Sequence, residues 1–332
     1  VVGAIIPWNF PVFLLAFKLP AALLAGNSIV VKPAPTTPLT TLRFGELIAN
    51  VLPAGLVNII ADKNDLGDKI TTHKGISKIS FTGSTATGSR VLASAASTLK
   101  RVTLELGGND AGIVMDDVDV EAVAPQIFDG AFGNNGQICI AMKRVYAHES
   151  IYDKLVDQLA ELAKEAAVGN GLEQGTKLGP LQNKMQFEKG KDYIEEGRAD
   201  GTIVAGGEVP DGKGYFIPPT IVKDIDDESR LVKEEQFGPV LPVIKYDDID
   251  DVIERANDSD YGLGGSVWSS DTDRAYEVAK KVDSGTIWVN KHADVQPHIP
   301  FGGIKTSGIG AELGEEGLAE FTARKVINVA KA

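Results

Sequence analysis

The sequence alternates between short apolar runs and longer stretches with helical periodicity, and this alternation constrains the fold more than any other feature. Consecutive parallel strands need a crossover helix, so the pattern predicts an α/β fold whose parallel sheet is covered on both faces. The first runs are VVGAII at 1–6, SIVVK at 28–32, GLVNII at 55–60 and KISF at 78–81, with helices predicted near 12–25, 39–51, 65–73 and 85–97.

A second alternating series begins at RVTLEL and DAGIVM. Its predicted helices lie near 119–133, 150–166, 185–197 and 271–282, and a strand is predicted at 285–290. A capping-box-like pair, Ser150 and Asp153, predicts that one of these helices starts at Ser150. Domain boundaries are expected near Gly107–Asn109 and between Phe237 and Phe301, which divides the chain into 1–107, 108–300 and 301–332.

Composition narrows the possible partners. The 332 residues suffice for about two domains. A net charge of −13 without a Lys/Arg cluster argues against nucleic acid. The apolar stretch at 13–31 approaches the length of a membrane span, but Lys18, Pro20, Gly26 and Asn27 interrupt it, so no span is expected.

The cysteine count bears on location and chemistry. A single cysteine, Cys139, excludes an intramolecular disulfide, so a reducing compartment, the cytoplasm, is expected. Cys139 lies in GNNGQICIA, where Gly133 and Gly136 would let a ligand approach the thiol. A lone cysteine is more often a small buried apolar residue. The four histidines form no Cys/His hydrolase signature, and no metal site is predicted.

Three further segments could carry chemistry, although each has an ordinary structural interpretation. Glu105 ends an apolar strand in LELGG, a costly place for a charge without a partner or a function. Asn9 lies between prolines in PWNFP, where its amide could be a fixed donor to an oxyanion. In FTGSTATG, Gly83 and Ser84 join a strand to a helix start, which could bind a pyrophosphate, although the pattern is not GxGxxG.

Taken together, the motifs resemble the aldehyde dehydrogenase superfamily, in its order and at its spacing, over essentially the whole chain. The motifs are PWNFP at 7–11, KPAPTTP at 32–38, FTGST at 81–85, LELGG at 104–108, GQICIA at 136–141, EEQFGPV at 234–240, NDSDYGLGGSVW at 257–268 and PFGGIKTSGIG at 300–310.

The resemblance implies a role for each matching residue. Cys139 would be the nucleophile, Glu105 the general base, and Asn9 with the backbone N–H of Cys139 the oxyanion hole. The remaining implied roles are cofactor binding by Trp8, Lys32, Gly83, Ser84, Glu235 and Phe237, proton relay by Lys18 and Glu312, and a substrate tunnel walled by Phe10, Phe17 and Phe301.

The resemblance also implies an oxidoreductase with a Rossmann-like cofactor domain over 1–107, a catalytic domain over 108–300, and a return segment with an oligomerisation strand over 301–332. It would oxidise an aldehyde through a thiohemiacetal and a cysteine thioester. NAD is the expected cofactor, and NADP is admissible because Pro35 stands where many NAD-preferring relatives carry a glutamate.

Other readings stay open at this point. A CoA-acylating relative would pass the thioester to CoA, although such enzymes usually lack the carboxylate at the Glu105 position. A catalytically silent relative is the third possibility, because full-length members carry a further N-terminal segment. Those members form homodimers or homotetramers, and the C-terminal KVINVAKA would pair in their oligomerisation arm.

Overall fold

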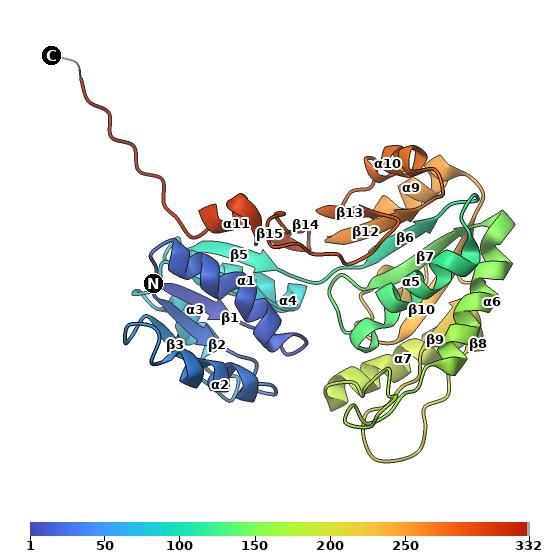
Figure 1. Ribbon diagram of the computed structural model, residues 1–332, viewed down its shortest axis with the longest axis horizontal. Coiled ribbons are helices and arrows are strands. Elements are labelled where there is room, and N and C mark those ends of the chain that lie inside the picture. Colours follow the sequence, from blue (N-terminus) through green and yellow to red (C-terminus); the bar gives the residue numbers. More distant parts are fainter. Residues whose placement is uncertain (331–332) are drawn as a thin grey trace. The chain divides into compact units, whose positions relative to one another are not determined.

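The computed structural model describes residues 1–330, which form two compact units. The first unit comprises Val1–Glu105, Val295–Gly302 and the chain from Gly308 onward, and the second comprises Leu106–Asp294 and Gly303–Ser307. Figure 1 colours the chain along its sequence, so that the first unit combines the blue N-terminal elements with the red C-terminal ones. The assignment of a cofactor domain and a catalytic domain to the two units stays a prediction.

A six-stranded sheet organises the first unit. Its strands are β1 (Val2–Ile5), β2 (Ile29–Lys32), β3 (Val57–Ile59), β4 (Lys78–Thr82), β5 (Arg101–Glu105) and β15 (Gly308–Ile309), in the order β15-β5-β4-β1-β2-β3. All neighbours are parallel except β15, which runs antiparallel to β5. The chain winds outward from β1 to β3 and then returns to the other side of β1 for β4. The strand order therefore reverses between β1 and β4.

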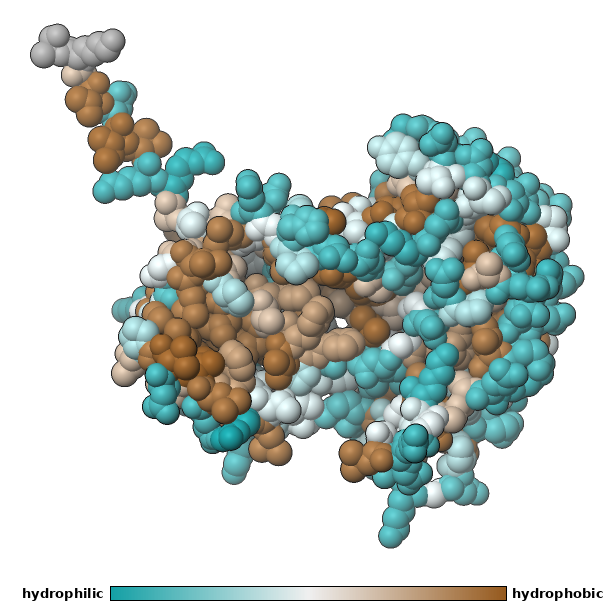
Figure 2. Space-filling view, in the orientation of Figure 1, coloured by the Kyte–Doolittle hydropathy of each residue, from teal (hydrophilic) through white to brown (hydrophobic). Residues whose placement is uncertain are grey.

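The helices of the first unit are α1 (Pro11–Leu24), α2 (Leu39–Ile48), α3 (Gly67–Thr72), α4 (Thr85–Ala96) and α11 (Gly314–Ala319). Pro11 opens α1, where its missing N–H costs nothing. Leu15 and Leu19 of α1 are buried in a core that includes Ile29 and Val31 of β2. Some apolar side chains of α1 and α2 are exposed, namely Val12, Phe13, Leu24, Leu39 and Leu47. Figure 2 shows hydrophobic surface, in brown, on this part of the chain.

The C-terminal segment forms no strand in the part of the chain that the structure describes. Residues 323–330 extend away from α11, as Figure 1 shows. Val326, Ile327 and Val329 are 76–79% exposed. Pairing of this segment in an oligomer stays a prediction, and the last two residues of KVINVAKA lie outside the described residues.

A seven-stranded sheet organises the second unit. Its strands are β6 (Asp110–Val114), β7 (Met142–His148), β8 (Thr202–Ala205), β9 (Thr220–Lys223), β10 (Val240–Tyr246), β12 (Gly264–Trp268) and β13 (Thr286–Val289), in the order β13-β12-β6-β7-β10-β9-β8. Only β8 runs antiparallel to its neighbour. A separate two-stranded ladder joins β11 (Tyr261–Gly262) to β14 (Ile304–Lys305).

Helices cover both faces of this second sheet, which confirms the predicted α/β class. One core contains side chains of α5 (Val120–Phe132) and α6 (Glu149–Glu165). The opposite core contains side chains of α7 (Lys184–Asp200), α9 (Ile249–Asn257) and α10 (Thr272–Ala279). The short α8 (Arg230–Lys233) and the 3₁₀ turn η1 (Gly133–Gly136) complete the unit.

The predicted start of α6 at Ser150 is wrong. The helix begins at Glu149, and its cap is His148, whose Nδ1 accepts the backbone N–H of Ser150 at 3.3 Å. The imidazole of His148 thus caps the helix, and not the hydroxyl of Ser150. Among the described helices, none is both long and apolar enough to span a membrane.

Candidate active site

The predicted cofactor residues of the first unit lie at one edge of its sheet. The strand register aligns Ile5 with Phe81 and with Lys32, and Thr82 with Glu105, so the carboxyl ends of these parallel strands are level. The loop that carries Trp8 and Asn9 follows β1, and Gly83 and Ser84 follow β4. In open α/β sheets, ligands bind beyond the carboxyl ends of strands where the strand order reverses, and the reversal here is between β1 and β4.

The amide of Gly83 is not free for a pyrophosphate, contrary to the expectation from the sequence. It donates to the carbonyl oxygen of Glu105 at 3.0 Å. A Cβ at this position would lie 2.5 Å from the ring of Phe81, so any residue other than glycine would have to displace that buried ring. Ser84 caps α4 by accepting the N–H of Thr87. An anion at this edge would therefore have to use N–H groups of the first turn of α4 and not that of Gly83.

Lys32 forms an ion pair that the sequence analysis missed. Its Nζ lies 3.0 Å from Oδ1 of Asp62, and both side chains are almost fully buried. The other oxygen of Asp62 accepts the N–H groups of Asp65 and Leu66, each at 3.0 Å. Burial raises the pKa of Asp62, but the hydrogen bond from Leu66 and the contact with Lys32 outweigh it and lower this pKa below its usual value. An ionised carboxylate is thus fixed beside Lys32.

Glu105 is buried at the end of β5, with 4% of its surface exposed. Neither of its carboxylate oxygens has a hydrogen-bond partner within the described part of the chain. Burial, and then the charge of Glu312, raise its pKa well above the usual value, while Lys18 opposes the shift. A Cβ on Gly302 would lie 3.4 Å from Oε1 of Glu105, so the segment after Phe301 packs close to this carboxylate.

The two predicted relay residues form a buried ion pair. Lys18 and Glu312 are hydrogen-bonded to each other, and their side chains are 0% and 1% exposed. Lys18 also donates to Oγ1 of Thr82 at 2.8 Å, and Ser80 donates to Glu312 at 3.1 Å. Because Glu312 also acts electrostatically on Glu105, the structure brings Lys18 and Glu312 together with the predicted base.

Two of the three predicted tunnel aromatics share a neighbour that the sequence analysis did not name. Phe13 lies edge-on to Phe10 and to Phe17, with ring centroids 6.1 and 4.8 Å apart. Phe17 is buried, whereas Phe13 is 55% exposed. Phe301, the third predicted residue, is buried and bridges to Glu312 through paired backbone hydrogen bonds of 2.7 Å.

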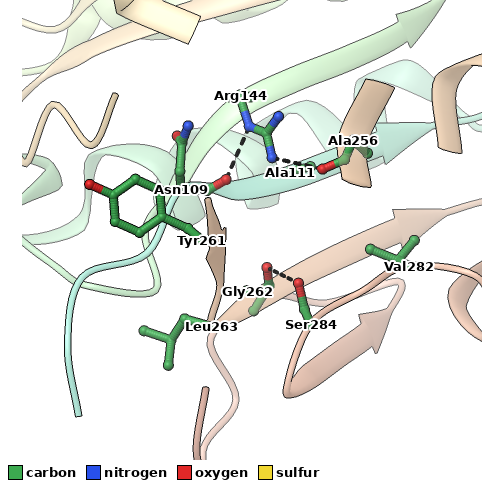
Figure 3. A pocket seen from close by; sticks show the side chains of 10 residues that line it. Asn109, Ala111, Arg144, Ala256, Tyr261, Gly262, Leu263, Val282 and Ser284 are labelled. Carbon is green, nitrogen blue, oxygen red and sulfur yellow. Dashed lines mark hydrogen bonds between the residues drawn. The ribbon is translucent and has the colours of Figure 1, made fainter. Parts of the chain in front are cut away.

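The two described cavities of the second unit do not coincide with the predicted site residues. Asn109, Arg144 and Tyr261 are among the residues that line the first cavity, as Figure 3 shows. Its volume is about 10 Å³, which is room for about one water molecule. A second cavity of about 160 Å³ is lined by charged side chains that pair with one another, such as Arg255 with Asp227. Neither cavity contains Cys139 or Glu235 in its lining.

Cys139 is half-buried and follows a strained turn at the amino end of β7. Asn134, Asn135 and Gly136 have φ angles of 50°, 59° and 70°, in the left-handed region that disfavours residues with a Cβ. Glycine is required at 136 because a Cβ would lie 2.4 Å from the carbonyl oxygen of Gly238. The close approach of the protein's own backbone therefore explains this glycine, and not the approach of a ligand that the sequence predicts.

Two amides hold this turn in place, and the sequence analysis named neither. Asn135 donates through Nδ2 to the carbonyl oxygen of Gly179 at 2.7 Å. Oε1 of Gln137 accepts the N–H of Gln182 at 2.9 Å, and its Nε2 donates to the carbonyl oxygen of Asn134 at 2.9 Å. The only signal in the sequence is their position in NNGQIC, directly before the cysteine.

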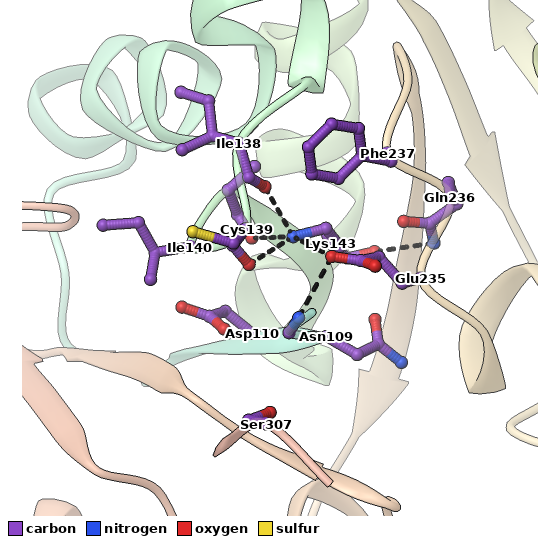
Figure 4. A network of polar contacts seen from close by, with 12 residues as sticks. Asn109, Asp110, Ile138, Cys139, Ile140, Lys143, Glu235, Gln236, Phe237 and Ser307 are labelled. Carbon is purple, nitrogen blue, oxygen red and sulfur yellow. Dashed lines mark hydrogen bonds and ion pairs between the residues drawn. The ribbon is translucent and has the colours of Figure 1, made fainter. Parts of the chain in front are cut away.

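A lysine lies next to Cys139, as Figure 4 shows. Lys143 is 3% exposed, and its Nζ donates to the carbonyl oxygens of Ile138 and Cys139 at 2.8 and 2.7 Å. The same Nζ lies 3.9 Å from Oε1 of Glu235. Sequence reasoning missed Lys143, because a lysine four residues after a cysteine carries no signal by itself.

Glu235, a predicted ribose ligand, faces the start of the second unit. Its Oε1 accepts the N–H of Gly108 at 3.0 Å, and a Cβ on Gly107 would lie 2.5 Å from its Oε2. Burial raises its pKa, while Lys143 opposes the shift. Phe237 follows with a φ of 52°, and its carbonyl oxygen accepts a hydrogen bond from Gln186 at 2.7 Å.

Asp110 and His292 complete the surroundings of Cys139. Burial raises the pKa of Asp110 to about 7, with Lys143 opposing. Burial lowers the pKa of His292 to about 4, so this imidazole is neutral. Its Nε2 lies 2.7 Å from the carbonyl oxygen of Ile140 and its Nδ1 3.1 Å from Oγ of Ser266. Among residues 1–330, no three His, Cys, Asp or Glu side chains gather as a metal site would require.

Comparison with known proteins places this arrangement in a family. The chain is 46% identical to a mitochondrial aldehyde dehydrogenase of Leishmania tarentolae, over 99% of this chain and 67% of that protein. It superposes with a TM-score of 0.94 on an NAD+ complex of aldehyde dehydrogenase from Bacillus cereus, at 42% identity, covering 97% of this chain and 66% of the other. An NAD+ complex of betaine aldehyde dehydrogenase from Staphylococcus aureus gives 0.93 at 38% identity, covering 96% and 65%.

The chain thus spans about two thirds of the length of these relatives. The model of the aldehyde dehydrogenase family matches residues 1–327, essentially all of the sequence. The eight motifs of the sequence analysis lie within this match. The chain therefore belongs to the aldehyde dehydrogenase family.

Proposed function

We propose that this protein oxidises an aldehyde to a carboxylic acid with a nicotinamide dinucleotide as hydride acceptor. The observation that carries the proposal is the state of Glu105, a buried carboxylate with a raised pKa and no hydrogen-bond partner among the described residues. Such a group is costly to bury unless it has a function, and hydrolysis of a thioester needs a base with a pKa near neutrality. Membership of the family supplies the reaction class.

Each step of the proposed reaction uses a residue of this chain. The thiolate of Cys139 attacks the aldehyde carbon, which gives a thiohemiacetal whose oxyanion accepts hydrogen bonds from Asn9 and from the N–H of Cys139. A bound dinucleotide would take up the hydride, which leaves a thioester on Cys139. Glu105 then removes a proton from water, the hydroxide adds to the thioester carbon and expels the thiolate of Cys139, and the carboxylic acid leaves. The buried pair of Lys18 and Glu312 would pass the proton from Glu105 onward.

The residues at the carboxyl edge of the first sheet fit a dinucleotide. Relatives from Bacillus cereus and Staphylococcus aureus bind NAD+. Here the edge offers the start of α4 after Ser84 for the pyrophosphate and Lys32 for ribose hydroxyls, with Trp8 in the loop after β1. Glu235 and Phe237 stay proposed cofactor contacts, on the ground of the EEQFGPV motif alone.

NAD is the favoured cofactor because of Asp62. Pro35 leaves the KPAPTTP segment without a carboxylate that could repel a 2′-phosphate. Asp62, from a different loop, supplies such a carboxylate. Its ion pair with Lys32 also neutralises the positive charge that would otherwise attract a 2′-phosphate. NADP stays admissible as a weaker cofactor.

An assay of NADH production with a panel of aldehydes tests the proposal. The account predicts turnover with at least one aldehyde in the absence of CoA. Turnover only when CoA is added would favour the acylating alternative, and no NADH with any aldehyde, with or without CoA, would favour a catalytically silent relative. A homodimer or homotetramer and a cytoplasmic location stay predictions, which size-exclusion chromatography with light scattering and cell fractionation would test.

A further inference from the structure

Lys143 is a buried cation for which the proposed reaction has no role. It is 3% exposed and stands four residues after Cys139, where the chain enters β7. An ammonium is buried only when hydrogen bonds or opposite charges compensate the loss of water. Its partners are the carbonyl oxygens of Ile138, Cys139 and Ala141, at 2.8, 2.7 and 3.4 Å, and the carboxylate of Glu235 at 3.9 Å. Figure 4 shows these contacts converging on one nitrogen.

The contact with Ile138 determines where the N–H of Cys139 points. The peptide bond between the two residues is planar and trans, so its carbonyl and its N–H point in opposite directions. Fixing the carbonyl oxygen of Ile138 therefore fixes the direction of the N–H of Cys139, the proposed backbone donor to the oxyanion. The peptide group after Cys139 contains the carbonyl of Cys139 itself, which Lys143 binds at 2.7 Å. Lys143 thus anchors the peptide groups on both sides of Cys139, and His292 holds the next carbonyl, that of Ile140, at 2.7 Å.

The charge of Lys143 also acts on the groups around the turn. Asp110 and Glu235 are the buried carboxylates that face it, and it opposes the effect of burial on the pKa of each. Arg144 and Lys189 are the other cations acting on these carboxylates, and His292 is neutral. Lys143 is hydrogen-bonded at 2.7 Å to the carbonyl of the same residue that carries the thiol, and a neighbouring positive charge favours a thiolate.

We propose that Lys143 is a positioning residue for Cys139, which orients the backbone N–H of Cys139 through the carbonyl of Ile138 and favours the thiolate through its buried charge. The proposal deepens the proposed function, because it assumes that Cys139 is the nucleophile. Its two parts depend on different properties of the side chain, hydrogen bonding and charge.

The pH dependence of Cys139 alkylation tests the charge. Cys139 is the only cysteine of the chain, so the rate of reaction with iodoacetamide reports on it alone, without substrate or cofactor. Lys143→Met and Lys143→Gln both remove the charge, and the midpoint of the rate profile should rise by roughly one pH unit or more, as expected for loss of an opposite charge at this range. Lys189→Met is the control: Lys189 is half-buried and donates to the carbonyl oxygen of Glu235 at 2.7 Å. Its profile should stay at the parent midpoint.

The single-turnover rate of NADH formation tests the hydrogen bonds. It should fall roughly tenfold or more in Lys143→Met even at a pH above the midpoint, where the thiol is ionised, and Lys143→Gln should recover part of the loss because its amide can still donate. A parent-like alkylation midpoint in Lys143→Gln, with circular dichroism showing a folded protein, would overturn the charge argument even if the methionine variant fails to fold. Equal acylation rates for parent and Lys143→Met, together with equal midpoints, would overturn the whole proposal. If the parent oxidises no aldehyde but the alkylation midpoint still shifts in the Lys143 variants, the charge effect on Cys139 stands and the proposed function is rejected.

Discussion

Glu105 and Glu312 are two buried carboxylates that act on each other electrostatically, and Lys18 forms its ion pair with Glu312. The negative charge of Glu312 adds to burial in raising the pKa of Glu105. The relationship couples the proposed base to its proposed relay. A base works only in its ionised form, so turnover should rise with pH as Glu105 loses its proton.

The first prediction concerns this pH dependence. Glu312→Gln removes a like charge, so the pKa of Glu105 should fall and the acidic limb of the pH profile of kcat should move to lower pH. Lys18→Met removes an opposing positive charge and should move the limb to higher pH. The pH profiles are measured with an aldehyde for which deacylation limits the rate of turnover. An acidic limb that stays in place in both variants would show that Glu105 does not set it.

The second prediction concerns the choice of cofactor. Asp62→Asn removes a carboxylate beside Lys32, so the KM for NADP should fall by roughly tenfold while that for NAD changes little. Pro35→Glu adds a carboxylate in the same region and should raise the KM for NADP more than that for NAD. Steady-state kinetics with both cofactors measure the ratio. Parallel changes for the two cofactors would remove both residues from the specificity argument.

The third prediction concerns the oxyanion. Asn9→Ala should lower the single-turnover rate of NADH formation by roughly two to three powers of ten, the usual effect of losing one such donor. The fold should be retained, because Asn9 lies in a loop that Pro11 already fixes at the start of α1. An unchanged rate would mean that the amide serves only the loop.

The fourth prediction is structural. Gly136→Ala places a Cβ 2.4 Å from the carbonyl oxygen of Gly238, at a residue whose φ is 70°. The free energy of unfolding, measured by thermal denaturation, should therefore fall by about 1–3 kcal/mol or more. Gly133→Ala is the control from the same turn: its Cβ would meet Ile138 at an ordinary 3.5 Å, and its φ is negative. Equal stability of the two variants would contradict the account of the turn.

The fold was largely predictable because alternation of strands and helices is a local signal. The predicted helix at 39–51 is found at Leu39–Ile48, and the predicted strand KISF is found within β4. The return of residues 295–302 and 308–330 to the first unit was not predictable, since it depends on long-range pairing such as that of β15 with β5. The cap of α6 was missed because histidine is an uncommon cap.

The site was predictable only as far as the family motifs reach. Cys139, Glu105 and Asn9 were singled out because each lies in such a motif, and their roles stay predictions. Asp62 escaped notice because its partner, Lys32, is distant along the chain. Lys143 escaped notice because the turn that brings its Nζ to the carbonyl oxygens of Ile138 and Cys139 is not evident from the sequence. Gly83 shows the reverse error: the strand–helix junction predicts an available amide, but a hydrogen bond to the carbonyl oxygen of Glu105 occupies it.

The central claim is that Glu105 activates the water that releases a thioester from Cys139, and Glu105→Gln tests it most directly. The amide keeps the shape of the side chain but cannot accept the proton. On mixing the variant with NAD and an aldehyde substrate of the parent, we predict a burst of one equivalent of NADH, little further turnover, and an acyl adduct on Cys139 visible as added mass on the intact protein. Cys139→Ala should give neither burst nor adduct. Normal steady turnover by Glu105→Gln, or the absence of both burst and adduct, would contradict the account.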